Sequence, residues 1–237
     1  MQARRYPGIG LILAGVIPAL LVPGVAALFY FVICRNAPAA RWIYSGAKLF
    51  LVVWPFLWWL VARPPRSMRR RRGPAWWRVW LEGLASGLVM AGAVWLAVRS
   101  PLGERLYAAS GAIRDRVQHL GVAGHYIAFV AALSLVNSLI EEYYWRWFVF
   151  GRLRSFLTPW PAAAVASLAF AAQHAIVTGR MLTWPLGLLC GAGVFLAGFV
   201  WSLQFDRHRS LVGVWFSHVV VDVTVFVIGW QVLRAGG

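Results

Sequence analysis

The amino-acid sequence predicts an all-α, polytopic membrane protein with about seven transmembrane helices and one amphipathic surface helix. Hydrophobic residues make up 61% of the 237-residue chain and charged residues only 13%, which argues against a soluble domain. The 15 tryptophans fit the same class, because indole rings favour the membrane–water interface. Apolar runs long enough to cross a bilayer recur along the whole chain.

Seven apolar segments are candidates for these spans. They run over residues 8–33, 46–62, 77–98, 123–150, 160–178, 183–205 and 210–232. Residues 99–120, between the third and fourth segments, mix charged residues with Leu102, Leu106, Ile113 and Val117. That pattern is typical of an amphipathic helix that lies along the membrane surface.

The formal net charge of +16 would suggest a nucleic-acid partner in a soluble protein. Here the arginines cluster between apolar runs, so we predict contact with anionic lipid headgroups and no nucleic acid. The densest cluster, Arg69–Arg72, predicts a cytoplasmic loop, because loops rich in Lys and Arg usually stay on the cytoplasmic side. The N-terminus would then also be cytoplasmic. The arginines of 99–120 would lie outside, which is an exception to this positive-inside rule. An arginine-rich, lysine-poor composition suggests a GC-rich bacterial genome, and hence the bacterial inner membrane.

Several polar residues stand inside the apolar segments. They are Glu141, Glu142, Arg146, His174, His218 and Asp222. Placing the four formally charged groups of this set at the bilayer centre would cost about 10–14 kcal/mol if they stayed unpaired. A chain with no use for such groups should not carry them, so they predict a functional site.

Helical spacing indicates how these side chains pair. Glu142 and Arg146 stand at i,i+4 with the acid first, which is the favourable order for an ion pair. His218 and Asp222 share a helix face for the same reason, as do Phe170 and His174. Glu141 is turned by about 100° from Glu142 and can face a different neighbour.

A carboxylate with nearby imidazoles can orient a water, remove its proton and stabilise the oxyanion formed at an attacked carbonyl. A set made of His174, His218 and Glu141 could instead bind a divalent metal such as zinc, and the residues leave both mechanisms open. HExxH, GxGD and GxSG motifs do not occur, and the only lysine is Lys48. A proton-coupled transporter is a less favoured alternative, because no inverted repeat is visible.

The segments "EEYYWR", "FAAQH" and "HVVVD" resemble, in order, the EExxxR, FxxxH and HxxxN/D motifs of the CPBP family. This family contains the CAAX proteases and bacteriocin-processing enzymes, which are glutamic-type intramembrane proteases. The resemblance covers roughly residues 123–232. It implies a catalytic membrane core over 123–237 and, over 1–122, variable N-terminal helices with the basic loop and the interfacial helix.

The resemblance also implies roles for single residues. Glu141 would activate the water, with His174 as its partner, and His218 with Asp222 would stabilise the oxyanion. Glu142 and Arg146 would hold the helix of the first motif in place.

Two positions keep alternatives open. Asn137, one turn before Glu141, could hydrogen-bond within the site or serve helix packing. Family members with a prenylated substrate usually carry Asn where this chain has Asp222, and an ionised Asp cannot donate a hydrogen bond. Asp222 is therefore expected to be protonated, to orient His218 or to favour a metal.

The expected function is an intramembrane endopeptidase that hydrolyses a peptide bond of a membrane-associated protein or peptide, in a C-terminal tail or a leader. A bacterial source would make prenylated proteins an unexpected substrate. The alternative within the family is a non-catalytic scaffold or immunity protein.

Overall fold

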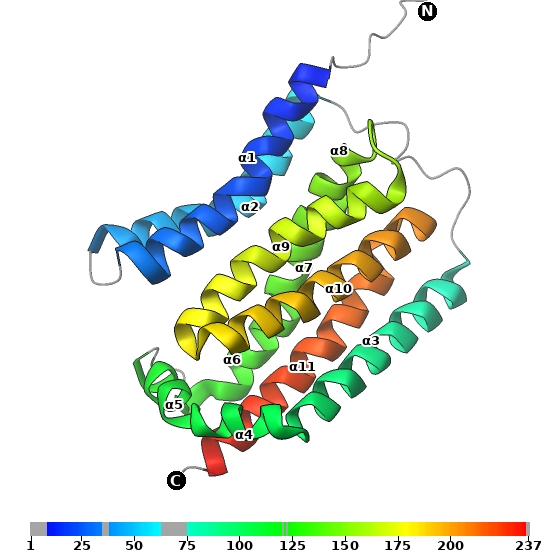
Figure 1. Ribbon diagram of the computed structural model, residues 1–237. Coiled ribbons are helices and arrows are strands. Elements are labelled where there is room, and N and C mark those ends of the chain that lie inside the picture. The colour runs from blue at the N-terminus through cyan, green and yellow to red at the C-terminus, as the bar shows by residue number, and fades with distance from the viewer. Residues whose placement is uncertain (1–8, 35–37, 63–74, 120, 122, 236–237) are drawn as a thin grey trace, which may run out of the picture.

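The computed structural model describes residues 9–34, 38–62, 75–119, 121 and 123–235, and within these ranges it contains helices and no strands (Figure 1). Seven of the described helices are long and apolar enough to cross a membrane. They are Ile9–Ile33, Trp42–Val61, Trp76–Val98, Tyr126–Leu153, Pro159–Met181, Trp184–His208 and Leu211–Arg234. The predicted all-α membrane fold is therefore confirmed, whereas the cluster Arg69–Arg72 lies outside the described residues.

The N-terminal part forms α1 (Ile9–Leu28) with the π-helical turn η1 (Phe29–Ile33), α2 (Pro38–Val61), α3 (Trp76–Val98), α4 (Pro101–Ala108) and α5 (Ser110–His119). After the short turn η3 (Ala123–His125), the fourth span consists of α6 (Tyr126–Ala132), η4 (Leu133–Asn137), α7 (Ser138–Glu142), η5 (Tyr143–Phe150) and α8 (Gly151–Leu153). The last three spans are α9 (Pro159–Met181), α10 (Trp184–His208) and α11 (Leu211–Ala235).

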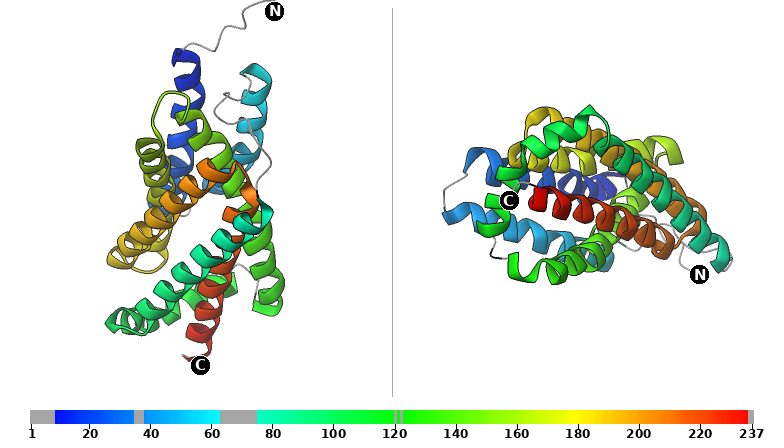
Figure 2. Two further views of the ribbon diagram at one scale, coloured as in Figure 1. Left: turned by 90° about the vertical axis from the view of Figure 1, so that its right-hand side faces the viewer. Right: turned by 90° about the horizontal axis from the view of Figure 1, so that it is seen from below.

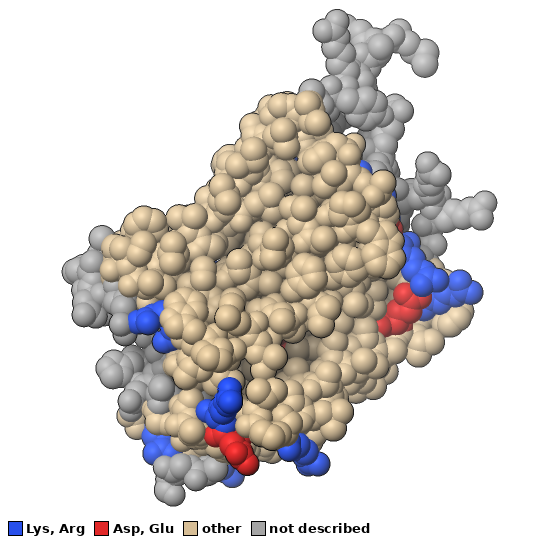
Figure 3. Space-filling model, in the orientation of Figure 1, with Lys and Arg blue, Asp and Glu red and all other residues tan. Residues whose placement is uncertain are grey.

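The long helices form one bundle. α9 packs along α10, α3 packs along α11, and α1 pairs with α2 and lies on α9 (Figures 1 and 2). α1 begins at one end of the bundle and α11 ends at the other, as seven spans require (Figure 1). On the face shown in Figure 3, the charged side chains lie along the left-hand, lower and right-hand edges, and a wide central region is almost free of them. Such a region suits the hydrocarbon layer of a membrane.

Within the stretch 99–120, where one amphipathic helix was predicted, the structure has two helices, α4 and α5, which are separated at Ala109. The hydroxyl of Ser100 caps α4 by accepting a hydrogen bond from the backbone N–H of Leu102 at 3.3 Å. Both helices lie at the end of the bundle where α11 finishes (Figure 1).

Glycines bring α3 and α11 into close contact. A Cβ atom added to Gly83 would collide with the backbone of Gly213, and one added to Gly213 would lie 2.6 Å from the carbonyl oxygen of Val79. Small residues allow helix backbones to approach in this way inside a membrane. The close approach also places Ser86 Oγ 3.0 Å from Ser217 Oγ, next to His218.

The fourth span departs from a regular α-helix. The π-helical stretches η4 and η5 lie on either side of α7, which carries Glu141 and Glu142. η5 is built of bulky residues, and most of its aromatic side chains are buried in the core. Such local widening is rare in helices and is frequent at functional sites. The apolar pattern predicted the helix but not this change in its winding.

Candidate active site

The two adjacent glutamates of α7 are both buried, and apart from His218, which lies near both, they face different partners. Glu142 is fully buried and Glu141 is 5% exposed. Glu142 contacts Arg146 and His218, whereas Glu141 contacts Asn137 and borders a cavity. This agrees with the predicted turn of about 100° between adjacent helix residues, which points the two carboxylates in different directions.

One oxygen of Glu142 binds two neighbours. Its Oε1 lies 3.0 Å from Nη1 of Arg146, which is the predicted i,i+4 ion pair. The same oxygen lies 2.7 Å from Nδ1 of His218 on α11. Since the carboxylate accepts, Nδ1 of His218 carries a proton, and the second glutamate fixes the orientation of this imidazole.

The other nitrogen of His218 faces the remaining acidic residues. Nε2 lies 3.5 Å from Oδ1 of Asp222 and 3.9 Å from Oε2 of Glu141. The indole of Trp201 stacks on the imidazole with 4.5 Å between ring centroids, and its Nε1 donates to Ser217 Oγ at 2.8 Å. His218 is thus held in the plane of its ring by Glu142 and on one face by Trp201.

Arg146 is buried between two aromatic rings. Its guanidinium carbon lies 4.7 Å from the ring centre of Phe170 and 5.0 Å from that of Trp201. A Cβ atom added to Gly198 would lie 3.2 Å from Nη2 of Arg146, so glycine leaves room for this side chain. Cation–π contact and the ion pair together hold the arginine inside the bundle.

His174 extends from α9 beside Phe170. Its Nδ1 donates to the carbonyl oxygen of Phe170 at 2.9 Å, since that oxygen can only accept. The neutral ring then keeps a lone pair on Nε2. His174 and Glu141 line the same cavity of about 130 Å³, which lies between α1, α2, α7 and α9.

Glu141 uses its two oxygens differently. Oε1 accepts a hydrogen bond from Nδ2 of Asn137 at 3.0 Å and lies 4.0 Å from Nζ of Lys48, and Oε2 faces His218. The hydrogen bond shows that Asn137 contacts the site. Lys48 was not among the residues predicted to belong to the site. The available signal was its position, because it is the only lysine of the chain and stands in an apolar segment.

The sequence-predicted residues come together as follows. His218 lies within 4 Å of both Glu141 and Asp222, and His174 shares a cavity with Glu141. Among the described residues, no group of three or more His, Cys, Asp or Glu side chains is placed to hold a metal ion. Zinc binding by His174, His218 and Glu141, which the sequence left open, stays a prediction.

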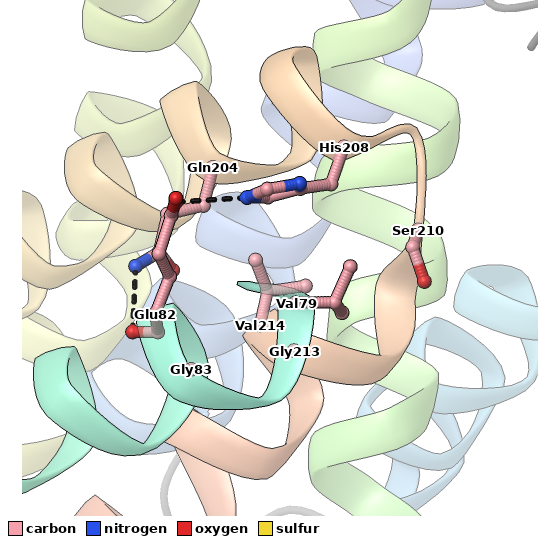
Figure 4. Close-up of a pocket in the computed structure, with 8 residues that line it drawn as sticks. All are labelled: Val79, Glu82, Gly83, Gln204, His208, Ser210, Gly213 and Val214. Atoms are coloured by element: carbon pink, nitrogen blue, oxygen red, sulfur yellow. Dashed lines mark hydrogen bonds and ion pairs between the residues drawn. The ribbon is translucent and has the colours of Figure 1, made fainter. Parts of the chain in front are cut away.

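A second, smaller cavity lies between α3, α10 and the beginning of α11 (Figure 4). Nε2 of His208 lies 2.8 Å from the carboxylate of Glu82, and Nε2 of Gln204 donates to the Glu82 carbonyl at 3.2 Å (Figure 4). The cavity has a volume of about 10 Å³, which is enough for one water molecule at most. These contacts join two helices and leave no space for a substrate.

Comparison with known proteins agrees with the motifs. No curated protein and no solved structure matches the chain. A family model described as type II CAAX prenyl endopeptidase Rce1-like matches residues 123–224, which include all three motifs and every acidic and histidine residue of the site. Residues 123–224 are thus similar to the Rce1-like type II CAAX endopeptidases, in agreement with the resemblance that the three motifs indicated.

Proposed function

We propose that this protein is an intramembrane endopeptidase in which Glu141 activates the attacking water. The observation that carries the proposal is that the two carboxylate oxygens of Glu141 have different surroundings. One of its oxygens is held by Asn137, while the other faces His218 beside a cavity that also contains His174. A buried carboxylate with one free oxygen is a suitable general base for a water molecule.

In the proposed reaction, a water in the cavity donates one hydrogen bond to Glu141 and one to the lone pair on Nε2 of His174. Glu141 takes a proton as the water oxygen bonds to the peptide carbonyl carbon. When the carbon–nitrogen bond breaks, that proton passes to the leaving amine. The products are a new carboxyl terminus and a new amino terminus.

His218 would stabilise the oxyanion. Because Nδ1 donates to Glu142, a donor toward the substrate requires a second proton on Nε2, so His218 acts as an imidazolium. Asp222, 3.5 Å from Nε2, would pair with that imidazolium and position it. Of the three roles open to Asp222, which are to be protonated, to orient His218 or to favour a metal, we propose that it orients His218.

The substrate is proposed to be a membrane-associated protein or peptide that is cut in a C-terminal tail or a leader. The cavity borders α1 and α2 as well as α7 and α9, so helices of the N-terminal part, 1–122, would contact the substrate while 123–237 supplies the catalytic groups. We also propose a bacterial inner membrane and a cytoplasmic N-terminus. A fluorescent protein fused after α11 would then be exported and stay dark.

The test uses purified protein in liposomes with a library of peptides. Each peptide has a hydrophobic anchor and a randomised segment on its N- or C-terminal side, and mass spectrometry identifies the products. We expect cleavage within one of the two randomised segments by wild type, and cleavage at least about 100-fold slower by a parallel preparation of Glu141→Gln. A wild-type preparation that yields no Glu141-dependent product would contradict the proposed protease function. It would favour the alternative, a non-catalytic scaffold or immunity protein.

A further inference from the structure

Lys48 is a cation in an unexpected place. It is the only lysine among the 23 basic residues of the chain, and it lies within the span Trp42–Val61. A lysine at the bilayer centre costs about 2.5–3.5 kcal/mol on insertion scales. Residues of this kind usually face a functional partner inside the bundle. Here the ammonium group faces the site through Asn137 and Glu141.

The contacts form a relay with a defined direction. Nζ of Lys48 donates to Oδ1 of Asn137 at 3.1 Å, and Nδ2 of Asn137 donates to Oε1 of Glu141 at 3.0 Å. An ammonium group can only donate, so it fixes which end of the amide points toward it. The donor end of Asn137 is thereby turned toward Glu141.

We propose that Lys48 is a positioning residue that acts through Asn137 to orient the carboxylate of Glu141. The relay occupies Oε1 and leaves Oε2 facing His218 and the catalytic water. Without Lys48, Oδ1 of Asn137 loses its donor, so the amide is held only by its hydrogen bond to Glu141 and is less fixed in position. This inference rests on the proposed protease function and extends it to a residue of the N-terminal part, outside the matched segment 123–224.

Lys48 also lines the cavity, with 45% of its side chain exposed, and a direct contact with an anionic group of the substrate is the rival role. The two roles differ in kinetics. A positioning residue changes kcat and leaves KM nearly unchanged, whereas a substrate anchor raises KM. They also differ in how Lys48 couples to Asn137.

The experiment is a double-mutant cycle with Lys48→Met and Asn137→Leu, assayed in liposomes on a peptide that wild type cleaves. We expect Lys48→Met to lower kcat about 10- to 100-fold, which is the scale of a small misplacement of a catalytic group. In the Asn137→Leu background, the same substitution should cost less than about twofold, because the relay is already broken. Lys48→Arg should retain more activity than Lys48→Met, since a guanidinium can also donate to Asn137.

A matched control is Arg180→Met, which removes a cation that donates to the carbonyl of Phe31 and does not line the cavity. It should leave kcat within about twofold of wild type if charge alone has no effect on the site. Lys48→Met with unchanged kcat, a rise in KM alone, or additive losses in the double variant would each overturn the positioning role. If wild type cleaves and Glu141→Gln does not, any of these three outcomes contradicts the positioning role of Lys48 but not the proposed protease function. If wild type does not cleave, both proposals fail together.

Discussion

Nδ1 of His218 lies 2.7 Å from Oε1 of Glu142, so the second glutamate of the pair joins α11 to α7. The same oxygen lies 3.0 Å from Arg146, a residue that is itself enclosed by Phe170 and Trp201. One carboxylate oxygen therefore couples the ion pair of the first motif to the histidine of the third. Glu142 both neutralises a buried arginine and sets the orientation of His218.

These two roles of Glu142 can be separated by mutation. Glu142→Leu should destabilise the protein by about 3–5 kcal/mol, because it leaves the buried charge of Arg146 without a partner. Glu142→Leu with Arg146→Met replaces the pair by apolar side chains and should recover most of that stability. Activity should stay low in both variants, since His218 has lost its acceptor. Thermal unfolding in detergent and peptide cleavage would measure the two effects, and a double variant with restored activity would contradict the orienting role.

The close approach of α3 and α11 should matter for the position of His218. Gly83→Ala introduces a Cβ that collides with the backbone of Gly213, and separating the helices should cost about 1–3 kcal/mol. Gly92→Ala on the same helix meets no atom within 4 Å and serves as the control. We expect Gly83→Ala to lower both the unfolding temperature and the cleavage rate, while Gly92→Ala changes neither. Equal behaviour of the two variants would argue against this packing.

Removal of metal should leave the reaction unchanged. Within the described part of the chain no three His, Cys, Asp or Glu side chains are placed to hold an ion, and Nδ1 of His218 already donates to Glu142. Protein treated with a strong zinc chelator should therefore cleave the library peptide at the rate of untreated protein. Loss of activity that is restored by added zinc would show that the side chains rearrange around a metal.

The fold could be predicted from the sequence because each span is long and apolar enough to be recognised as a transmembrane helix. Contacts within one helix could also be predicted, since the i,i+4 spacing of Glu142 with Arg146 fixes their distance. The contact of Glu142 with His218 and the approach of Lys48 could not, because both depend on how helices far apart in sequence pack. The π-helical winding around Glu141 leaves too small a signal in the apolar pattern.

The rate of peptide cleavage by Glu141→Gln tests the central claim most directly. The substitution keeps the size of the side chain and removes the base, so kcat should fall by about 10²- to 10⁴-fold. Glu104→Gln on α4, an exposed acid outside the site, should cleave like wild type. Both variants should unfold at nearly the wild-type temperature. Cleavage by Glu141→Gln at the wild-type rate would contradict the role of Glu141 as the water-activating base.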